Sequence, residues 1–233
     1  MEVRMIFRYK TDYMRYITRL VSQGYIFWLS GEMDADPHYK IISMLAKFDD
    51  RYSVNATSQQ RFRRRQKGLA SVRFLAWFCL KTLRLHWILL ATEGQLDGGE
   101  TFHDSRLKKQ RIQISGYELK RQPRKGMSPA LSWAMTPETY EYWRSEIRFA
   151  IRQRDNQEFR QIWYSLRRVA GFRTLRKQVY RLQSYAIAEW KRSRKGDYPI
   201  EKIFVGWVGK YQKAETLTPE QVRNTSRNAC KRF

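Results

Sequence analysis

The sequence has few of the residues that most often carry out chemistry in proteins. It has two cysteines, Cys79 and Cys230, and only three histidines in 233 residues. One lies in an apolar run and the other in a polar tail, which is neither a disulfide framework nor a zinc-binding spacing, and they predict a reducing, cytoplasmic location. The chain also lacks a glycine-rich phosphate loop, a dinucleotide-binding fingerprint and a nucleophile elbow. We therefore expect neither ATP-driven nor redox chemistry, and no cofactor.

Long apolar runs are also missing. The longest, over residues 74–91, is interrupted by Lys81, Arg84 and His86 before it reaches the roughly 20 residues that a membrane span needs. The first residues contain no apolar segment followed by a small-residue cleavage site, so a secretory leader is not predicted. The sequence therefore predicts a soluble protein without a membrane partner.

Acidic residues are scarce relative to basic ones. The chain has 22 Asp and Glu against 46 Lys and Arg, a formal net charge of +24, although 42% hydrophobic residues suffice for a folded core. Such a surplus repels itself unless an anionic partner screens it. Nucleic acid is the partner that this charge favours, ahead of an anionic membrane face or an acidic protein.

The positive charge is concentrated in the second half of the chain. Residues 1–105 hold 16 Lys and Arg against 11 acidic residues, a net of +5, whereas residues 106–233 hold 30 against 11, a net of +19. We therefore predict a scaffold half over 1–105 and a basic helical half over 106–233. The two halves are expected to share one core, and residues 212–233 are expected to form a polar tail.

Hydrophobic periodicity predicts an α+β fold whose first half reads β-α-β-α-β-β. Alternation indicates a strand over 3–9, and a helix follows with Thr11 as its N-cap and Gly24 at its end. The remaining elements of this half are a short strand over 25–30, a helix capped by Asp36 and ending near residue 52, a loop or helix edge outside the core over 53–69, and strands over 70–78 and 85–92.

The second half is predicted to be mainly helical. Segments 111–123 and 131–135 indicate strands, after which Thr136-Pro137 and Asp155 open two helices. A third and longer helix is expected over 173–195. It buries an apolar stripe of Leu175, Val179, Leu182, Ala186 and Trp190.

The first candidate site is a run of cations in the predicted loop. Five of seven residues are basic, and the guanidinium fork matches the oxygens of a phosphate group. The alternative is a solvated loop whose charge only keeps the protein soluble. The residues of this predicted phosphate clamp are Arg61, Arg63, Arg64, Arg65 and Lys67.

The second candidate site is the face of the long third helix opposite its apolar stripe. With the helix that precedes it and the glycine at position 171, it has the outline of a helix-turn-helix, although many helical hairpins share that outline. The helix could enter a DNA groove, contact phosphates without reading bases, or be a plain solvated surface. The candidate residues are Arg173, Arg176, Lys177, Tyr180 and Arg181.

Candidate catalytic residues are few. Rolling-circle and conjugative nicking enzymes place two histidines, separated by one apolar residue, on a central strand. A tyrosine on a nearby helix attacks the phosphate. Here His86 lies in a strand but position 88 is Ile, so the second ligand is missing and the similarity is one of architecture only. His103 and Tyr185 are further catalytic candidates. A loop with Glu32, Asp34 and His38 is a candidate divalent-metal site.

These patterns together predict a nucleic-acid-binding protein, for DNA rather than RNA, and favour binding over catalysis without deciding whether the chain also catalyses a reaction. Replication, transcription control and transfer of a mobile element are the expected settings, within a nucleoprotein complex that includes protein partners. The alternative is a small nuclease or strand-nicking enzyme with a degenerate histidine site. A third possibility is a subunit that coats RNA without sequence preference.

Overall fold

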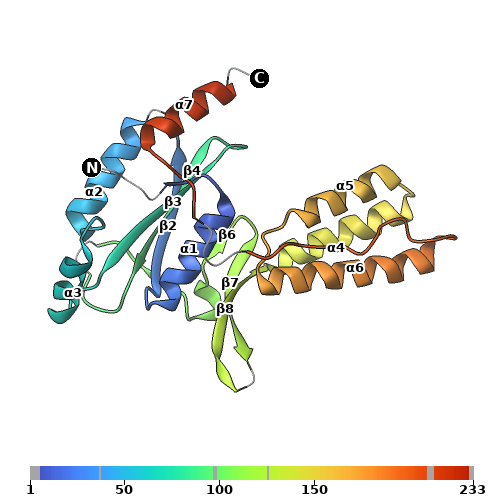
Figure 1. Cartoon of the computed structure of the whole chain (residues 1–233), viewed down its shortest axis with the longest axis horizontal. Coiled ribbons are helices and arrows are strands. Elements are labelled where there is room, and N and C mark those ends of the chain that lie inside the picture. Colours follow the sequence, from blue (N-terminus) through green and yellow to red (C-terminus); the bar gives the residue numbers. More distant parts are fainter. Residues whose placement is uncertain (1–5, 37, 97–98, 125, 209–212, 231–233) are drawn as a thin grey trace. The chain divides into compact units, whose positions relative to one another are not determined.

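The computed structural model describes residues 6–36, 38–96, 99–124, 126–208 and 213–230 of the chain (Figure 1). The chain forms two compact units. Unit 1 comprises Met1–Arg111 and Tyr211–Phe233, and unit 2 comprises Ile112–Lys210. The predicted α+β class is confirmed, with a large mixed sheet formed mostly by early strands and with helices dominating later.

Unit 1 is built on a six-stranded sheet in the order β5-β2-β4-β3-β1-β9. Strands β2, β3 and β4 are eight residues each and pair antiparallel along their whole length, whereas β1 lies parallel to β3. The predicted strands over 70–78 and 85–92 correspond to β3 and β4. The strands are β1 (Ile6–Phe7), β2 (Phe27–Asp34), β3 (Val72–Cys79), β4 (Arg84–Ala91), β5 (His103–Asp104) and β9 (Thr216–Leu217).

Successive side chains of a strand point to opposite faces of the sheet, and the central strands β3 and β4 bury side chains on both faces. On one face, Phe74 and Leu89 join a core completed by α2. On the other face, Leu75 and Ile88 are fully buried, and α1 packs against β3. The helices of unit 1 are α1 (Lys10–Ser22), α2 (Tyr39–Tyr52), α3 (Ser58–Gln66), the short 3-10 helix η1 (Lys108–Gln110) and α7 (Pro219–Cys230).

Two predicted helix caps are wrong. Helix α1 begins after Tyr9 rather than Thr11, and α2 begins after His38 rather than Asp36. The side chain of Asp36 instead lies 3.5 Å from Nε of Arg227 on α7. In neither helix does the side chain of the N-cap residue form a capping hydrogen bond. Polar residues such as Thr11 and Asp36, chosen for their capping side chains, therefore gave misleading boundaries.

Strand boundaries also differ from the prediction. Strand β2 continues to Asp34, four residues beyond the predicted end, because it pairs with the whole length of β4. Glu32 and Asp34 therefore lie on a strand and not in a loop. Of the predicted strand over 3–9, residues 3–5 lie outside the described residues, and the strand occupies Ile6–Phe7. Pro37, expected in the first turn of α2, also lies outside them.

The arginine-rich segment, predicted as a loop or a helix edge outside the core, is a helix. Its start is fixed by a capping box, in which the backbone N–H of Gln60 donates to Thr57 Oγ1 and the backbone N–H of Thr57 donates to Gln60 Oε1. The resulting helix, α3, has no fully buried residue and therefore no apolar stripe. Periodicity could not reveal it, although the Thr57-x-x-Gln60 pattern is visible in the sequence.

The predicted polar tail is largely ordered. Strand β9 pairs antiparallel with β1, with Leu217 opposite Ile6, and α7 follows directly. Val222 of α7 is fully buried in the core that α2 covers. The last part of the chain therefore completes unit 1, because one valine and one leucine suffice to anchor an otherwise polar segment.

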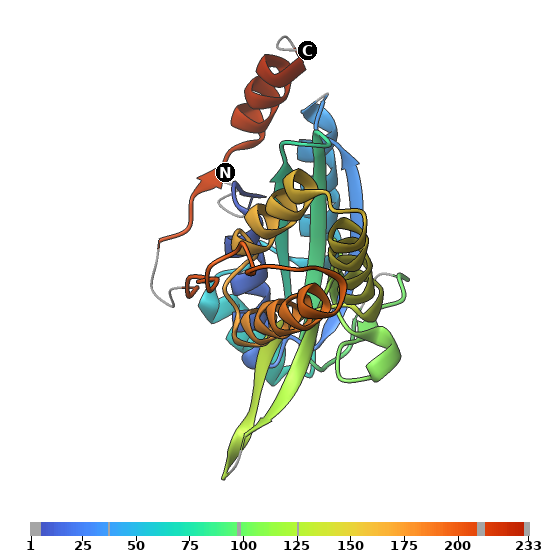
Figure 2. The same ribbon diagram turned by 90° about the vertical axis from the view of Figure 1, so that its right-hand side faces the viewer.

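Unit 2 combines a three-stranded antiparallel sheet with three helices. Figure 2, which turns the view by 90°, shows the three helices side by side and nearly end-on. Helix α4 packs against α5, α6 and β8, and α6 also packs against β8. The elements are β6 (Gln113–Ile114), β7 (Tyr117–Arg124), β8 (Met127–Met135), α4 (Pro137–Arg152), α5 (Asn156–Arg167) and α6 (Arg173–Ser193).

The helices of unit 2 form where their caps and stripes predict. Thr136 and Asp155 cap α4 and α5 through their side chains. Every residue of the stripe predicted for α6, from Leu175 to Trp190, is buried. None of the helices in the described part of the chain is long and apolar enough to cross a membrane.

The capping box generates a first prediction. Replacing Thr57 by Ala removes the acceptor for the Gln60 N–H and should lower the free energy of unfolding of unit 1 by about 1 kcal/mol. Urea unfolding followed by far-UV circular dichroism measures the change. Thr101→Ala, at an exposed position outside any helix, is the control and should leave the free energy unchanged. Equal losses in the two variants would contradict the assigned cap.

Candidate nucleic-acid interface

Helix α3 carries the predicted phosphate clamp, and the structure divides it into two groups. Arg63, Arg65 and Lys67 are exposed. Arg61 and Arg64 are half-buried and bond to nearby backbone: Arg61 Nη1 donates to the Ala56 carbonyl, and Arg64 Nε lies 3.4 Å from the Ala70 carbonyl. The first group is therefore free to meet a ligand, and the second ties α3 to the rest of unit 1.

The exposed cations of α3 have no carboxylate partner in the described part of the chain. Arg63 and Lys67 are four residues apart, so they lie on the same side of the helix and repel each other. Asp49 lines the hollow beside α3, but its carboxylate accepts the Asn55 N–H at 3.0 Å. Cations in a last turn do complement the helix dipole, which is the bland explanation for part of this cluster.

Two further arginines of unit 1, Arg73 and Arg19, add positive charge near α3. Burial lowers the pKa of Arg73 on β3, and the neighbouring charges of Arg61 and Arg19 lower it further. Nε of Arg73 is buried without a hydrogen-bond partner among the described residues. The sequence did not indicate this neighbourhood, because β3 and the end of α1 meet α3 only in the folded unit.

Helix α6 presents the second cluster on one exposed row. Arg173, Lys177 and Arg181 are spaced four residues apart, so they lie one above the other along the helix. All three are exposed, and none has an acidic side chain at ion-pair distance in the chain as described. This row is the part of the predicted α6 face that remains open.

The other two predicted residues of α6 bind the chain itself. Arg176 Nε donates to the Val205 carbonyl at 2.8 Å, and its guanidinium carbon lies 3.5 Å from the centre of the Trp207 ring. Arg176 Nη2 also bonds to the Tyr180 hydroxyl at 3.2 Å. Arg176 therefore holds the segment that follows α6, and Tyr180 bonds to Arg176, so both side chains are engaged within unit 2.

Gly171, between α5 and α6, is required by the packing of the same segment that follows α6. A Cβ atom at Gly171 would lie 1.7 Å from the carbonyl oxygen of Gly206, a distance that no side chain could occupy. Close approach of the two backbones therefore requires glycine at position 171. The glycine that gave the pair of helices a helix-turn-helix outline is explained by this packing.

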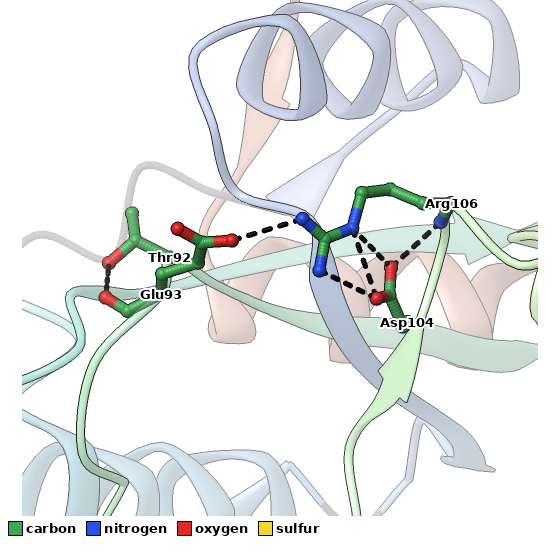
Figure 3. Close-up of polar contacts among 4 residues, drawn as sticks. All are labelled: Thr92, Glu93, Asp104 and Arg106. Atoms are coloured by element: carbon green, nitrogen blue, oxygen red, sulfur yellow. Dashed lines mark hydrogen bonds and ion pairs between the residues drawn. The ribbon is translucent and has the colours of Figure 1, made fainter.

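Elsewhere in the chain, carboxylates form ion pairs with individual arginines. Figure 3 shows Arg106 donating from Nε and Nη2 to Asp104 and from Nη1 to Glu93. Glu189 of α6, whose side chain is 3% exposed, accepts from Arg152 at 2.8 Å and Arg192 at 2.6 Å. The exposed cations of α3 and α6 differ from these arginines in having no carboxylate partner among the residues that the structure describes.

The structure brings together one pair of the predicted catalytic and metal candidates. His86 of β4 lies opposite Glu32 of β2, with Nδ1 3.3 Å from the carboxylate oxygen Oε2, and the imidazole stacks on Trp77 at 5.0 Å between ring centres. Arg84 lies 2.8 Å from the other oxygen of Glu32. The pKa of His86 is lowered overall. Burial lowers it most, the charge of Glu32 raises it, and the charge of Arg84 lowers it further.

The other candidates lie apart from this pair. His103 of β5 stacks on Trp28 at 5.1 Å between ring centres, and Tyr185 of unit 2 lies beneath the guanidinium of Arg144. His38 is the N-cap of α2. Among the described residues, no group of three His, Cys, Asp or Glu side chains could hold a metal ion.

Known proteins add no assignment to this geometry. Comparison of the chain with models of protein families, with curated proteins and with solved structures gives no match. The function must therefore be argued from the two cation rows and the His86 pair themselves.

The buried carboxylate of unit 2 generates a prediction for pH. Burial opposes ionisation of Glu189, but hydrogen bonds and charges from Arg152 and Arg192 outweigh it and lower the pKa of this carboxyl group. A lowered pKa stabilises the folded state above the unfolded value, near pH 4, and this stability is lost as the pH falls through the folded value. Glu189→Gln should therefore be less stable than the native protein at neutral pH, and the difference should shrink in acid.

Urea unfolding over a pH series measures that difference. Glu141→Gln, which removes an exposed carboxylate paired with Arg144, should cost little at any pH because exposed ion pairs contribute little. A constant difference between Glu189→Gln and the native protein at all pH values would contradict the assignment.

Proposed function

We propose that this chain is a nucleic-acid-binding protein that grips backbone phosphates with the exposed cations of α3 and α6, and that DNA is its ligand. One observation carries the proposal: both helices present exposed basic side chains without carboxylate partners in the described residues, while many other arginines of the chain are paired. Each phosphate that such a side chain neutralises releases condensed counterions, and this release drives binding.

The shape of the α6 row supports DNA over RNA. Cations repeating every fourth residue along a regular helix present a straight line of charge, which suits a helix lying along or across a wide groove. The major groove of B-form DNA admits a helix, whereas that of A-form RNA is too narrow. A role in replication, transcription control or mobile-element transfer would use such binding.

Replacing Arg63, Arg65 and Lys67 together by Ala tests the contribution of α3. Binding to duplex DNA should weaken, and the slope of log affinity against log salt should fall by about 2.7, at about 0.9 per lost phosphate contact. Fluorescence anisotropy with a labelled duplex at several salt concentrations measures both quantities. The corresponding α6 variant replaces Arg173, Lys177 and Arg181 and should behave in the same way.

The matched control removes the same charge from paired positions of unit 1. Arg8, Arg51 and Arg106 each contact a carboxylate, so their replacement by Ala changes the net charge equally but removes no open cation. This variant should keep most of its affinity and salt slope. Equal losses in both variants would show that binding follows net charge alone and not the proposed rows.

The contact between His86 and Glu32 favours a second candidate function, cleavage of a nucleic-acid strand. A neutral imidazole that donates Nδ1–H to a carboxylate keeps Nε2 free to accept a proton from a nucleophile. Arg84, beside the same carboxylate, could stabilise the charge that develops on a phosphate.

Incubation with labelled single- and double-stranded DNA and RNA, with and without magnesium, tests this second candidate. His86→Ala should abolish any cleavage and spare binding, because the cations of α3 and α6 are untouched. His103→Ala, which removes a histidine that stacks on Trp28, should leave cleavage intact. Cleavage that survives His86→Ala would exclude this site, and tight binding without any cleavage would leave binding as the whole function.

A further inference from the structure

Unit 2 contains a hollow that the two cation rows do not explain. It lies beside α5, has a volume of about 350 Å³, and is lined by Arg160, Gln161, Trp163, Tyr164, Arg167 and Ile200. This volume lies at the lower end of the range for small-ligand sites. The lining combines two aromatic rings and an aliphatic side chain with two arginines and an amide.

The aromatic wall of the hollow is held in place and accessible. Tyr164 is 59% exposed, yet its hydroxyl accepts a hydrogen bond of 3.0 Å from Arg168 Nη1, and the Arg168 guanidinium lies over its ring. Trp163 is almost fully buried beside it. Arg168 already restricts the rotamers of this exposed tyrosine. A ligand that binds to its ring therefore costs little additional side-chain entropy.

Two polar features of the hollow lack partners. Nε1 of Trp163 is buried and has no hydrogen-bond acceptor among the described residues, although buried donors are nearly always bonded. Arg160 and Arg167, both exposed, lie at no ion-pair distance from any acidic side chain that the structure describes. The hollow therefore offers two exposed cations, without acidic partners among the described residues, next to an aromatic surface.

We infer that this hollow binds one unpaired nucleotide, with its base stacked on Tyr164 and the adjoining phosphates bound by Arg160 and Arg167. Stacking is the interaction that single-stranded nucleic acid offers to an aromatic side chain, and any of the bases can provide it. In a duplex the faces of the bases are covered by their neighbours, so Tyr164 could not reach them. The inference rests on the proposed function and adds to it a site that recognises unpaired strands.

Binding of the full chain to two labelled DNA probes tests the inference. One is an oligothymidylate of about 12 nucleotides, within the usual site size of about 4–16, and the other is a blunt duplex. Tyr164→Ala should weaken binding of the oligothymidylate between about fivefold and about 150-fold, the range expected for one lost base stack, and should leave duplex binding unchanged. Anisotropy at one fixed salt concentration measures both affinities.

Two control variants separate stacking from structure. Tyr164→Phe keeps the ring and loses only the hydroxyl, so it should bind oligothymidylate nearly as the native protein does. Tyr142→Ala removes a similarly exposed tyrosine of the same unit, on α4, and should have no effect. Thermal unfolding of each variant shows whether the fold is kept, and loss of affinity with Tyr164→Phe equal to that with Tyr164→Ala would overturn stacking.

The remaining outcomes distinguish this inference from the proposed function. Native protein that binds duplex while Tyr164→Ala binds oligothymidylate normally would overturn the nucleotide site and leave phosphate binding by α3 and α6 intact. Equal loss on both probes would overturn it as well, since the hollow would then not distinguish unpaired bases. Native protein that binds neither probe would overturn the proposed function and this inference together.

Discussion

The shortage of carboxylates is the constraint on which the rest of this molecule depends. With 22 acidic residues against 46 basic ones, most cations must remain without a partner, and the structure determines which. Carboxylates are placed where segments distant in sequence must be joined: Glu215 with Arg8, Asp36 with Arg227, and Glu189 with Arg152. Among the described residues, the cations left over include those of α3 and α6, where the regular helix backbone fixes their spacing.

This allocation gives the two units a common physical character. In each, an ordinary apolar core supports a helix whose outer side carries only basic or neutral residues, α3 in unit 1 and α6 in unit 2. Repulsion within each row costs stability in the free protein and is relieved when a polyanion approaches. A fixed row of charge also binds with a smaller ordering cost than a flexible tail of the same charge. Unit 2 also exposes an aromatic side chain, Tyr164, in the hollow beside α5.

Elements with an apolar stripe or strong alternation could be predicted from the sequence, and elements without either could not. The stripe from Leu175 to Trp190 and the runs of β3 and β4 were sufficient to locate those elements. Helix α3 was not located because no residue of it is buried, and β9 and α7 were missed because Leu217 and Val222 give them too few apolar residues for a visible stripe. The cations of both clusters could be named in advance. That Arg176 would bind the Val205 carbonyl, or that Glu32 would lie beside His86, depends on pairings between distant segments.

The arrangement of unit 1 in two separate stretches of the chain has a consequence for synthesis on the ribosome. Strand β9, the neighbour of β1, is made only after all of unit 2. Unit 2 is a single continuous stretch, so it can fold as soon as it has left the ribosome. Until then the backbone of β1 stays unpaired on its outer side, and an open sheet edge invites other strands. The nascent protein therefore carries this open edge until β9 emerges and pairs with β1.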